Sequence, residues 1–413
     1  MALDRKTFDR INQNAPTWLA ARRTAGFEIF SESSMPTGAE ESWRYVDIPD
    51  DLHESILGEA GSLTIPPDPF LKAFAPRSGQ ATIVDGRVME FSGEHVSGID
   101  EANPPGETFG SLVDPRRDIY AAAHLAFASG GVHVRIPKGH EINTPIVVDC
   151  QAIAGVSFPH LLVEVEENAG AEVVVVYRSQ TGAEPTVVPA VELIVGDGSR
   201  LRYQAVQDFS QQTTAVIHQR ATVGRDATLS IGEVGLGGRL GRLDLGVLLE
   251  GSGAHCEVVG LFFGEGTQTL DYRMVITHRG RSTRSDVLLK GAVEDSAQSV
   301  FTGLLTIENQ AVRSEAYETN RNLVLSEEAK AHSVPNLEIL CNDVMCGHAS
   351  SVGPLDEEQL YYLGTRGLRQ SRAERLLVRG FFREVIERLP IHGADGPLQD
   401  AVDRRFARGQ VVE

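Results

Sequence analysis

The segment 341–348 concentrates side chains that bind soft metal ions. It reads Cys-Asn-Asp-Val-Met-Cys-Gly-His, and cysteine thiolate and histidine imidazole are ligands for zinc and iron. Cys346 and His348 are two positions apart, so their side chains share one face if the segment is extended, whereas Cys341 would point to the opposite face. A closed zinc site needs four ligands. The sequence therefore predicts either half of a metal site that a second chain completes, or merely buried thiols.

Other patterns that could carry catalysis are weaker. The chain contains neither a Gly-x-x-x-x-Gly-Lys-Ser/Thr loop nor a Gly-x-Ser-x-Gly elbow. The glycines of segment 235–241 are followed by more strand rather than by a helix, which favours turns over a dinucleotide site. Glu164 and Glu166 share one strand face, and a solvated outer face explains them better than glycoside chemistry. Cys256 lies beside an apolar strand and is expected in the core. We expect no catalytic residue in this chain.

Regularly spaced turns predict the architecture that positions segment 341–348. Turn sequences start at Asn168, Gly196, Gly224, Gly251, Gly280 and Asn309, at intervals of 27 to 29 residues. Short β-branched runs flank each turn, and no helix-length periodicity separates them. A fixed period in this range is typical of stacked repeats. We predict a right-handed parallel β-helix (a solenoid) over residues 115–352. The alternative, a β-sandwich, would repeat its hairpins at a shorter spacing of about 8–12 residues.

The regions on either side of the solenoid differ from it. Residues 1–114 are expected to form an N-terminal helical or mixed domain that includes a helix at 15–30, and a further helix is expected at 118–128. Residues 353–413 are expected to form a C-terminal helical domain, with capping boxes at 356–359 and 371–374 that begin two helices. These helices either plug the open end of the solenoid or dock a partner, because they carry a surplus of aromatic surface.

Composition narrows the classes of partner. The net charge of −19 argues against nucleic acid and against an anionic membrane surface. The start of the chain is charged and lacks the apolar stretch of a secretory signal, and no run of about 18 apolar residues predicts a membrane span. We expect a cytoplasmic protein whose four cysteines are reduced thiols.

An ordered block between residues 317 and 367 resembles the SufB/SufD family of iron–sulfur cluster assembly scaffold proteins. Residues 317–326 read Tyr-Glu-Thr-Asn-Arg-Asn-Leu-Val-Leu-Ser, and 335–348 and 352–367 continue the family signature. Residues 41–45, Glu-Ser-Trp-Arg-Tyr, resemble an N-terminal motif of the same family. B-type members have cysteine where this chain has Arg321, and an acidic-His-acidic stretch where it has Cys346-Gly347-His348. The resemblance is therefore to the D-type subunit, although Asn342 and Cys341 depart from the usual pattern.

The resemblance implies a non-catalytic scaffold in a complex with SufB and the ATPase SufC. SufB would pair through the solenoid, sulfur would arrive indirectly from a cysteine desulfurase, and ATP would act only through SufC. Cys346 and His348 would face SufB rather than the solenoid interior and hold a transient iron–sulfur cluster there. The isolated chain would hold no stable cluster and could self-associate. The C-terminal helices would dock SufC through an apolar set of side chains: Tyr361, Tyr362, Leu376, Leu377, Phe381 and Phe382.

Two other classes of protein remain as alternatives. A purely structural intracellular β-helix would have Cys346 and His348 buried and pointing inward. A carbohydrate-active β-helix enzyme would need a convergent pair of carboxylates in a groove, and the sequence predicts none.

Overall fold

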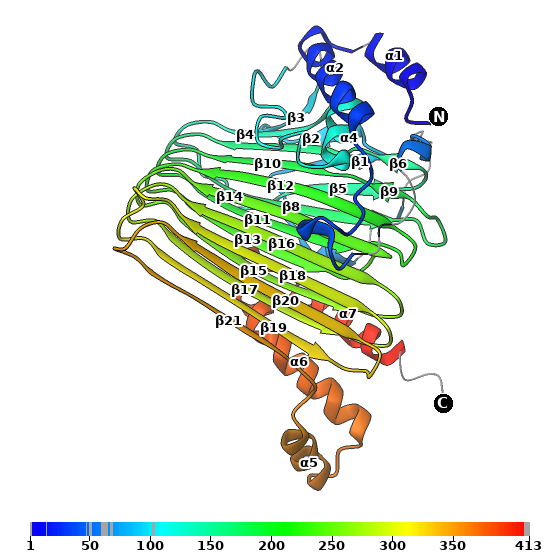
Figure 1. Cartoon of the computed structure of the whole chain (residues 1–413), viewed down its shortest axis with the longest axis vertical. Helices are drawn as coiled ribbons and strands as arrows, with labels where there is room; N and C mark the ends of the chain where they lie inside the picture. Colours follow the sequence, from blue (N-terminus) through cyan, green and yellow to red (C-terminus); the bar gives the residue numbers. More distant parts are fainter. Residues whose placement is uncertain are drawn as a thin grey trace.

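A computed structural model confirms the predicted parallel β-solenoid. It describes residues 2–13, 15–46, 48, 52–58, 65–66, 69–100 and 104–408, and for residues 406–408 it describes the backbone alone. The chain passes back and forth between two long, facing sheets (Figure 1). The ten-stranded sheet has the order β2 (Arg87–Ser92), β1 (Gly79–Val84), β5 (Ile146–Ala152), β8 (Gly170–Ser179), β11 (Arg200–Asp208), β13 (Thr228–Gly235), β15 (His255–Gly264), β17 (Arg284–Val293), β19 (Glu315–Val324) and β21 (Met345–Gly353).

The facing sheet has eleven strands. Its order is β20 (Lys330–Ile339), β18 (Gln298–Ile307), β16 (Thr269–His278), β14 (Leu240–Leu249), β12 (Thr214–Val223), β10 (Ala190–Val195), β7 (His160–Val165), β4 (Gly131–Ile136) and β3 (Val96–Ile99), with β6 (Val156–Ser157) and β9 (Thr186–Val187) beside this path. The pairs β1–β2 and β3–β4 are antiparallel and stand at the first end of the solenoid. The strands stacked from β4 and β5 onward pair in parallel.

A ladder of turns at one edge keeps the coils in register. Successive turns place Asn168, Gly198, Asp226, Gly253, Ser282 and Arg313 at positive φ. Each of these residues donates its N–H to a carbonyl of the next turn, for example Asn168 to Asp197 at 2.8 Å and Asp226 to Ser252 at 2.9 Å. Asparagine and aspartate tolerate the left-handed conformation better than bulkier residues do. The turn spacing in the sequence therefore reflects one hydrogen-bonded turn per coil.

The interior of the solenoid is a continuous core built from every second residue of each strand. Side chains such as Val175, Ile231, Val258 and Leu289 are fully buried there. Most of them are β-branched or otherwise aliphatic, which suits a pleated surface that is covered on its inner side.

N-terminal helices cover the outer face of the eleven-stranded sheet. They are α1 (Arg5–Gln13), α2 (Thr17–Glu32), the 3₁₀ turns η1 (Glu41–Trp43) and η2 (Leu52–Glu54), and α4 (Ile119–Phe127). Phe27, Phe30 and Phe127 pack in one cluster with Leu162 and Val216 of the sheet. The predicted helices at 15–30 and 118–128 correspond to α2 and α4. Asp118 caps α4 by accepting the N–H of Ala121 at 2.8 Å.

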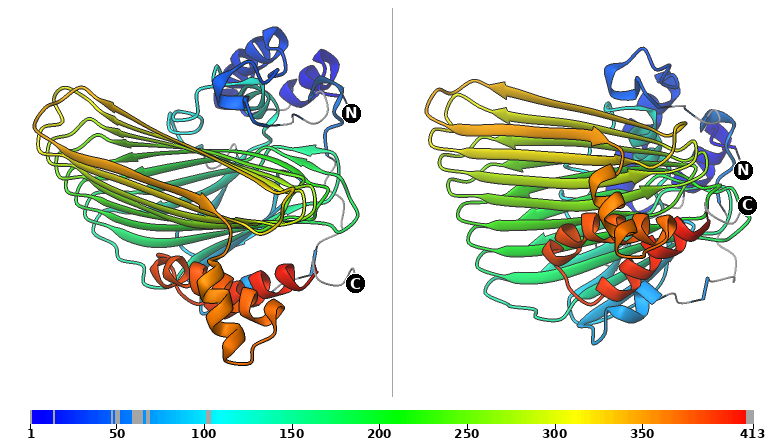
Figure 2. Two further views of the ribbon diagram at one scale, coloured as in Figure 1. Left: turned by 60° about the horizontal axis from the view of Figure 1, so that its bottom comes forward. Right: turned by 90° about the horizontal axis from the view of Figure 1, so that it is seen from below.

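C-terminal helices cover the outer face of the other sheet, together with the short α3 (Pro69–Ala73). They are α5 (Glu357–Thr365), α6 (Gln370–Arg388) and α7 (Asp395–Arg408). Figure 2 shows α6 and α7 lying across the strands, while α5 projects away. These helices therefore do not plug the open end of the solenoid. Among the described residues, no helix combines the length and apolar composition that crossing a bilayer requires.

One of the two predicted capping boxes is wrong. Asp356 caps α5 as expected, because its carboxylate accepts the N–H of Gln359 at 3.0 Å. By contrast, Ser371 is the second residue of α6, whose N-cap position is Arg369 and receives no side-chain hydrogen bond. Gln370 instead donates its side-chain amide to Glu374 at 2.9 Å. The helix begins before the serine, so the serine has no free position from which to cap it.

Candidate functional site

Cys346 and His348 lie on β21, the last strand of the ten-stranded sheet. Cys346 pairs in register with Ala316, and His348 pairs with Glu318. Ala316 and Glu318 are buried on the inner wall of the solenoid, and Cys346 packs against the same interior core. The expectation that these two side chains point away from the interior is therefore wrong. Their direction is set by pairing with β19, whose inner positions they continue.

The end coil is nevertheless open, because no further coil covers it. Cys346 is half-buried and His348 is exposed. The inner faces of β20 and β21 meet at Ser333 and Ser350, whose hydroxyl groups are 2.7 Å apart. Large apolar side chains are also exposed around this end, namely Tyr317, Ile339, Leu340, Met345 and Val352. A cluster of this kind is typical of a surface that binds another protein.

The described residues do not form a complete metal site. No group of three or more His, Cys, Asp or Glu side chains in the described ranges is placed to hold a metal ion. Cys341 is buried in the interior core. Cys256 is buried there as well, as predicted, and desolvation raises the pKa of its thiol. Cys346 and His348 thus remain two accessible ligands, which is half of a closed site.

Glu318 is a polar feature of this end that the sequence reasoning missed. It is 2% exposed, and neither carboxylate oxygen has a hydrogen-bond partner in the described part of the chain. Burial raises the pKa of this carboxyl group to about 8. The carboxylate reaches across the interior to Gly303 on β18, where a Cβ atom would collide with it. In the sequence, Glu318 alternates with Ala316 and Asn320 and so shares a strand face with them. This spacing identifies an inner-face residue only when it is known which face of the strand points inward.

The acidic pair Glu164 and Glu166 belongs to the outer surface, as predicted. Glu164 contacts His133 at 2.6 Å and Glu166 contacts Arg135 at 2.7 Å. Glu166 lines a surface pocket together with His133 and Arg135, but Glu164 is not one of its lining residues, so the two carboxylates do not converge in a groove.

The six apolar residues predicted to dock a partner fall into three groups by exposure. Tyr361, Tyr362 and Leu376 are 76%, 55% and 49% exposed. Leu377 and Phe381 are half-buried. Phe382 is 1% exposed and its ring lies 6.4 Å from that of Phe263 on β15, so it attaches α6 to the sheet. An amphipathic pattern identifies the apolar residues of a helix but does not say which of them the chain's own sheet covers.

Comparison with known proteins gives a consistent family. Residues 148–381 match the family model described as "SUF system FeS cluster assembly, SufBD core domain". An iron–sulfur cluster assembly SufBD family protein of Mycobacterium tuberculosis is 31% identical, over 92% of each chain. The iron–sulfur cluster assembly protein SufD of Bacillus subtilis is 32% identical over 69% of this chain and 66% of that protein. SufD of Escherichia coli is 23% identical over 91% and 90%.

Proposed function

The chain belongs to the SufBD family of iron–sulfur cluster assembly proteins, and on this premise we propose that it is the D-type, non-catalytic scaffold subunit of a SUF complex. In that role it pairs with a B-type subunit, SufB, and carries the ATPase SufC. The iron–sulfur cluster is cargo, held transiently during assembly. ATP acts through the ATPase, and sulfur comes indirectly from a cysteine desulfurase.

Arg321 supports the D-type role. It lies on β19 with an exposed side chain, and a guanidinium cannot serve as a ligand for iron. Relatives named SufD are among the matching proteins. We infer that the position which carries a thiol in B-type subunits has a different task in this chain.

The open end of the solenoid supports pairing with SufB. β20 and β21 are edge strands, and unpaired edges and uncovered coils are sites where another chain can add. The exposed Ile339, Met345 and Val352 supply apolar contact area at the same end. Cys346 and His348 lie within this region, so a second chain bound here can complete their ligand set. This coincidence of half a metal site with an uncovered solenoid end carries the proposal.

The test is cluster yield in purified complexes. His348→Ala and Cys346→Ala should leave complex assembly nearly intact, because little core volume is lost at a partly exposed position. Cluster content, counted as iron and sulfide per complex, should fall sharply. Ser351→Ala, on the outer face of the same strand, and Cys256→Ala, in the core, are controls that should keep the yield. A normal yield in both Cys346→Ala and His348→Ala would refute the role and favour a purely structural solenoid.

Docking of the ATPase is proposed for the exposed part of the C-terminal helices. Removal of residues 355–413 would uncover the sheet beneath Phe382 and Ile386 and would confuse unfolding with lost binding. Tyr361→Ala combined with Tyr362→Ala removes exposed rings only. Co-purification of SufC with this variant should fall, whereas undiminished recovery would count against docking through α5.

A further inference from the structure

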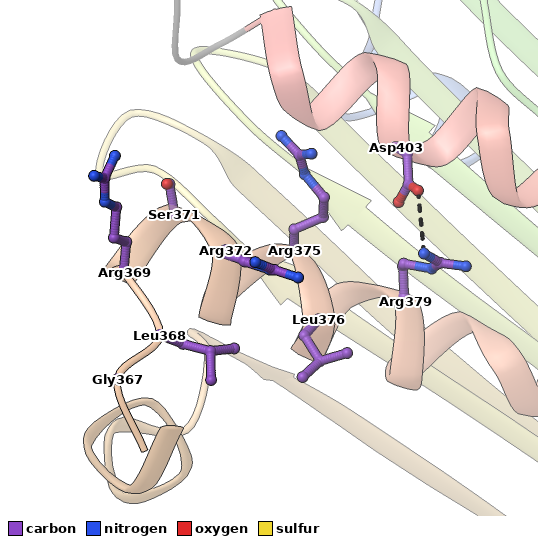
Figure 3. Close-up of a pocket in the computed structure, with 9 residues that line it drawn as sticks. All are labelled: Gly367, Leu368, Arg369, Ser371, Arg372, Arg375, Leu376, Arg379 and Asp403. Carbon is purple, nitrogen blue, oxygen red and sulfur yellow. Dashed lines mark ion pairs between the residues drawn. The ribbon is translucent and has the colours of Figure 1, made fainter. Parts of the chain in front are cut away.

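A cleft lies between α6, α7 and the link from α5 to α6, and its volume is about 950 Å³. Figure 3 shows the side chains that line it. They are Leu368, Arg369, Ser371, Arg372, Arg375, Leu376, Arg379 and Asp403, together with the backbone at Gly367. The cleft is large enough to hold several side chains of a partner.

Positive charge is concentrated along this cleft. Arg369, Arg372, Arg375 and Arg379 recur every three or four residues and so share one face of the helix. The whole chain carries a net charge of −19, so the cluster is a local reversal of sign. Like charges at this spacing destabilise a helix unless an anion neutralises them.

The chain itself neutralises this cluster poorly. Arg379 pairs with Asp403 of α7 at 3.4 Å. The other three arginines form no ion pair with any residue that the structure describes. The Nε–H group of Arg375 is buried and has no acceptor among those residues. A buried donor without a partner costs free energy that an incoming acceptor would recover.

We propose that this cleft binds acidic side chains of the ATPase subunit. The inference rests on the proposed function, and it adds the chemistry of the contact. Asp403 shows that a carboxylate fits against the helix face, since it already occupies one end. Leu368 and Leu376 supply apolar contact beside the charges. Leu376 also belongs to the exposed docking set, so the cleft and the docking surface are continuous.

The length of the cluster favours a protein segment over a small anion. From Arg369 to Arg379 the helix rises about 15 Å, and a single phosphate can contact only one part of that row. A segment with two or three carboxylates can contact the row at several points. Paired across an interface, such charges also set orientation and association rate.

Affinity for the purified ATPase tests the proposal in the full-length chain. The triple variant Arg369→Gln, Arg372→Gln, Arg375→Gln keeps side-chain length and removes three charges. Its Kd should rise on the order of 10- to 100-fold, as three weak ion pairs would give. The dependence of Kd on salt should become shallower. Arg383→Gln is the matched control, because Arg383 lies on the same helix, is exposed and pairs with Glu387; its Kd should change less than about twofold.

Stability separates a binding role from a structural one. The thermal midpoint of the triple variant should be unchanged or higher, because removing like charges relieves repulsion. If the triple variant is less stable, the single change Arg372→Gln, at an exposed position, provides the affinity measurement. An unchanged Kd in a folded variant overturns the proposal.

Two further outcomes identify which inference has failed. If Tyr361→Ala with Tyr362→Ala weakens binding and the arginine variants do not, the docking surface stands and the cleft has no part in it. If no variant changes binding, docking through these helices fails as well.

Inorganic phosphate titrated into the isolated chain tests the other occupant. Saturable phosphate binding that the triple variant loses, with ATPase affinity retained, would overturn the proposal.

Discussion

Glu233 is an acid sealed inside the solenoid. Its side chain is fully buried on β13, and Gln219 of β12 donates to one carboxylate oxygen at 3.0 Å. The other oxygen has no partner among the described residues. Desolvation raises the pKa of Glu233 to about 8, and the Gln219 hydrogen bond only partly opposes it. The group is therefore a neutral acid in the folded protein at neutral pH.

This burial predicts a stability that falls as pH rises. An unfolded glutamate has a pKa of about 4.3, so above that pH the unfolded chain releases the proton while the folded chain keeps it up to about pH 8. The free energy of unfolding should fall across this window, by up to about 5 kcal/mol for this group, and then level off. In urea titrations, the free energy of unfolding of Glu233→Gln should increase relative to that of the unsubstituted protein between pH 5 and pH 8. Parallel profiles would contradict the prediction.

For single residues, the sequence predicts side-chain chemistry better than it predicts side-chain direction. The chemistry of Cys346 and His348, and the fact that they share a face, could be predicted from type and spacing. The direction of that face could not, because it depends on which residues of β19 pair with β21. Glu233 and Glu318 escaped notice for the same reason, since an alternating glutamate looks like an outer-face residue until the parity of its strand is known.

The cap of α5 gives a prediction for one helix. Asp356→Ala removes the acceptor for the Gln359 N–H and should destabilise α5 locally by about 1 kcal/mol. Hydrogen exchange of the first turn of α5 should accelerate about fivefold. Ser371→Ala, which replaces no cap, should leave exchange in α6 nearly unchanged. Equal effects of the two substitutions would show that the assignment of the caps is wrong.

Close contact between two neighbouring strands of the ten-stranded sheet gives a prediction for one strand. A Cβ atom at Gly291 on β17 would collide with the Phe262 ring on β15, whereas nothing lies within 4 Å of a Cβ atom at Gly353 on β21. Gly291→Ala should lower the free energy of unfolding by about 1–3 kcal/mol through overpacking. Gly353→Ala should change it by less than about 0.5 kcal/mol. Denaturant unfolding of the two variants side by side is the measurement, and equal stability would refute the packing argument.

Elements were predictable where one physical rule governs them. The turn spacing predicted the coils because each coil needs one turn with a left-handed residue. The helix α7 (Asp395–Arg408) was not predicted, since Gly396 and Pro397 resemble a helix breaker. Both lie in the first turn of α7. Proline is tolerated there because the N–H groups of the first turn have no hydrogen-bond partner within the helix.

The N-terminal motif ties distant coils together across the whole molecule. The guanidinium of Arg242 on β14 lies 3.8 Å from the centre of the Trp43 ring, which also stacks on Tyr120. Tyr45 stacks on His332 of β20 at 4.5 Å. Arg242 and His332 stand in one register column of the eleven-stranded sheet, with Asp271 and Val300 between them. The motif thus links the middle of the solenoid to its last strand.

We predict that substituting one residue of this motif strongly lowers the stability of the fold. Trp43→Ala removes a buried ring from the junction of the helices and the sheet, and should cost about 3–5 kcal/mol of unfolding free energy. Phe91→Ala, at an exposed position on β2, is the control and should cost less than about 1 kcal/mol. Chemical denaturation followed by circular dichroism checks both. A small loss for Trp43→Ala would mean that the solenoid does not depend on the motif.

The ladder of turns also determines how a chain of this design can grow. Left-handed turn residues recur 27 to 31 positions apart from Asn168 to Arg313, and each coil presents the next with the same row of backbone donors and acceptors. Whole coils can then be copied or lost, whereas one deleted residue inverts the faces of a strand. A tandem duplication of residues 226–252 should fold and lengthen the particle by about 4.8 Å in small-angle scattering, and deletion of Val259 alone should prevent folding. The length of such a scaffold therefore changes in evolution by whole coils.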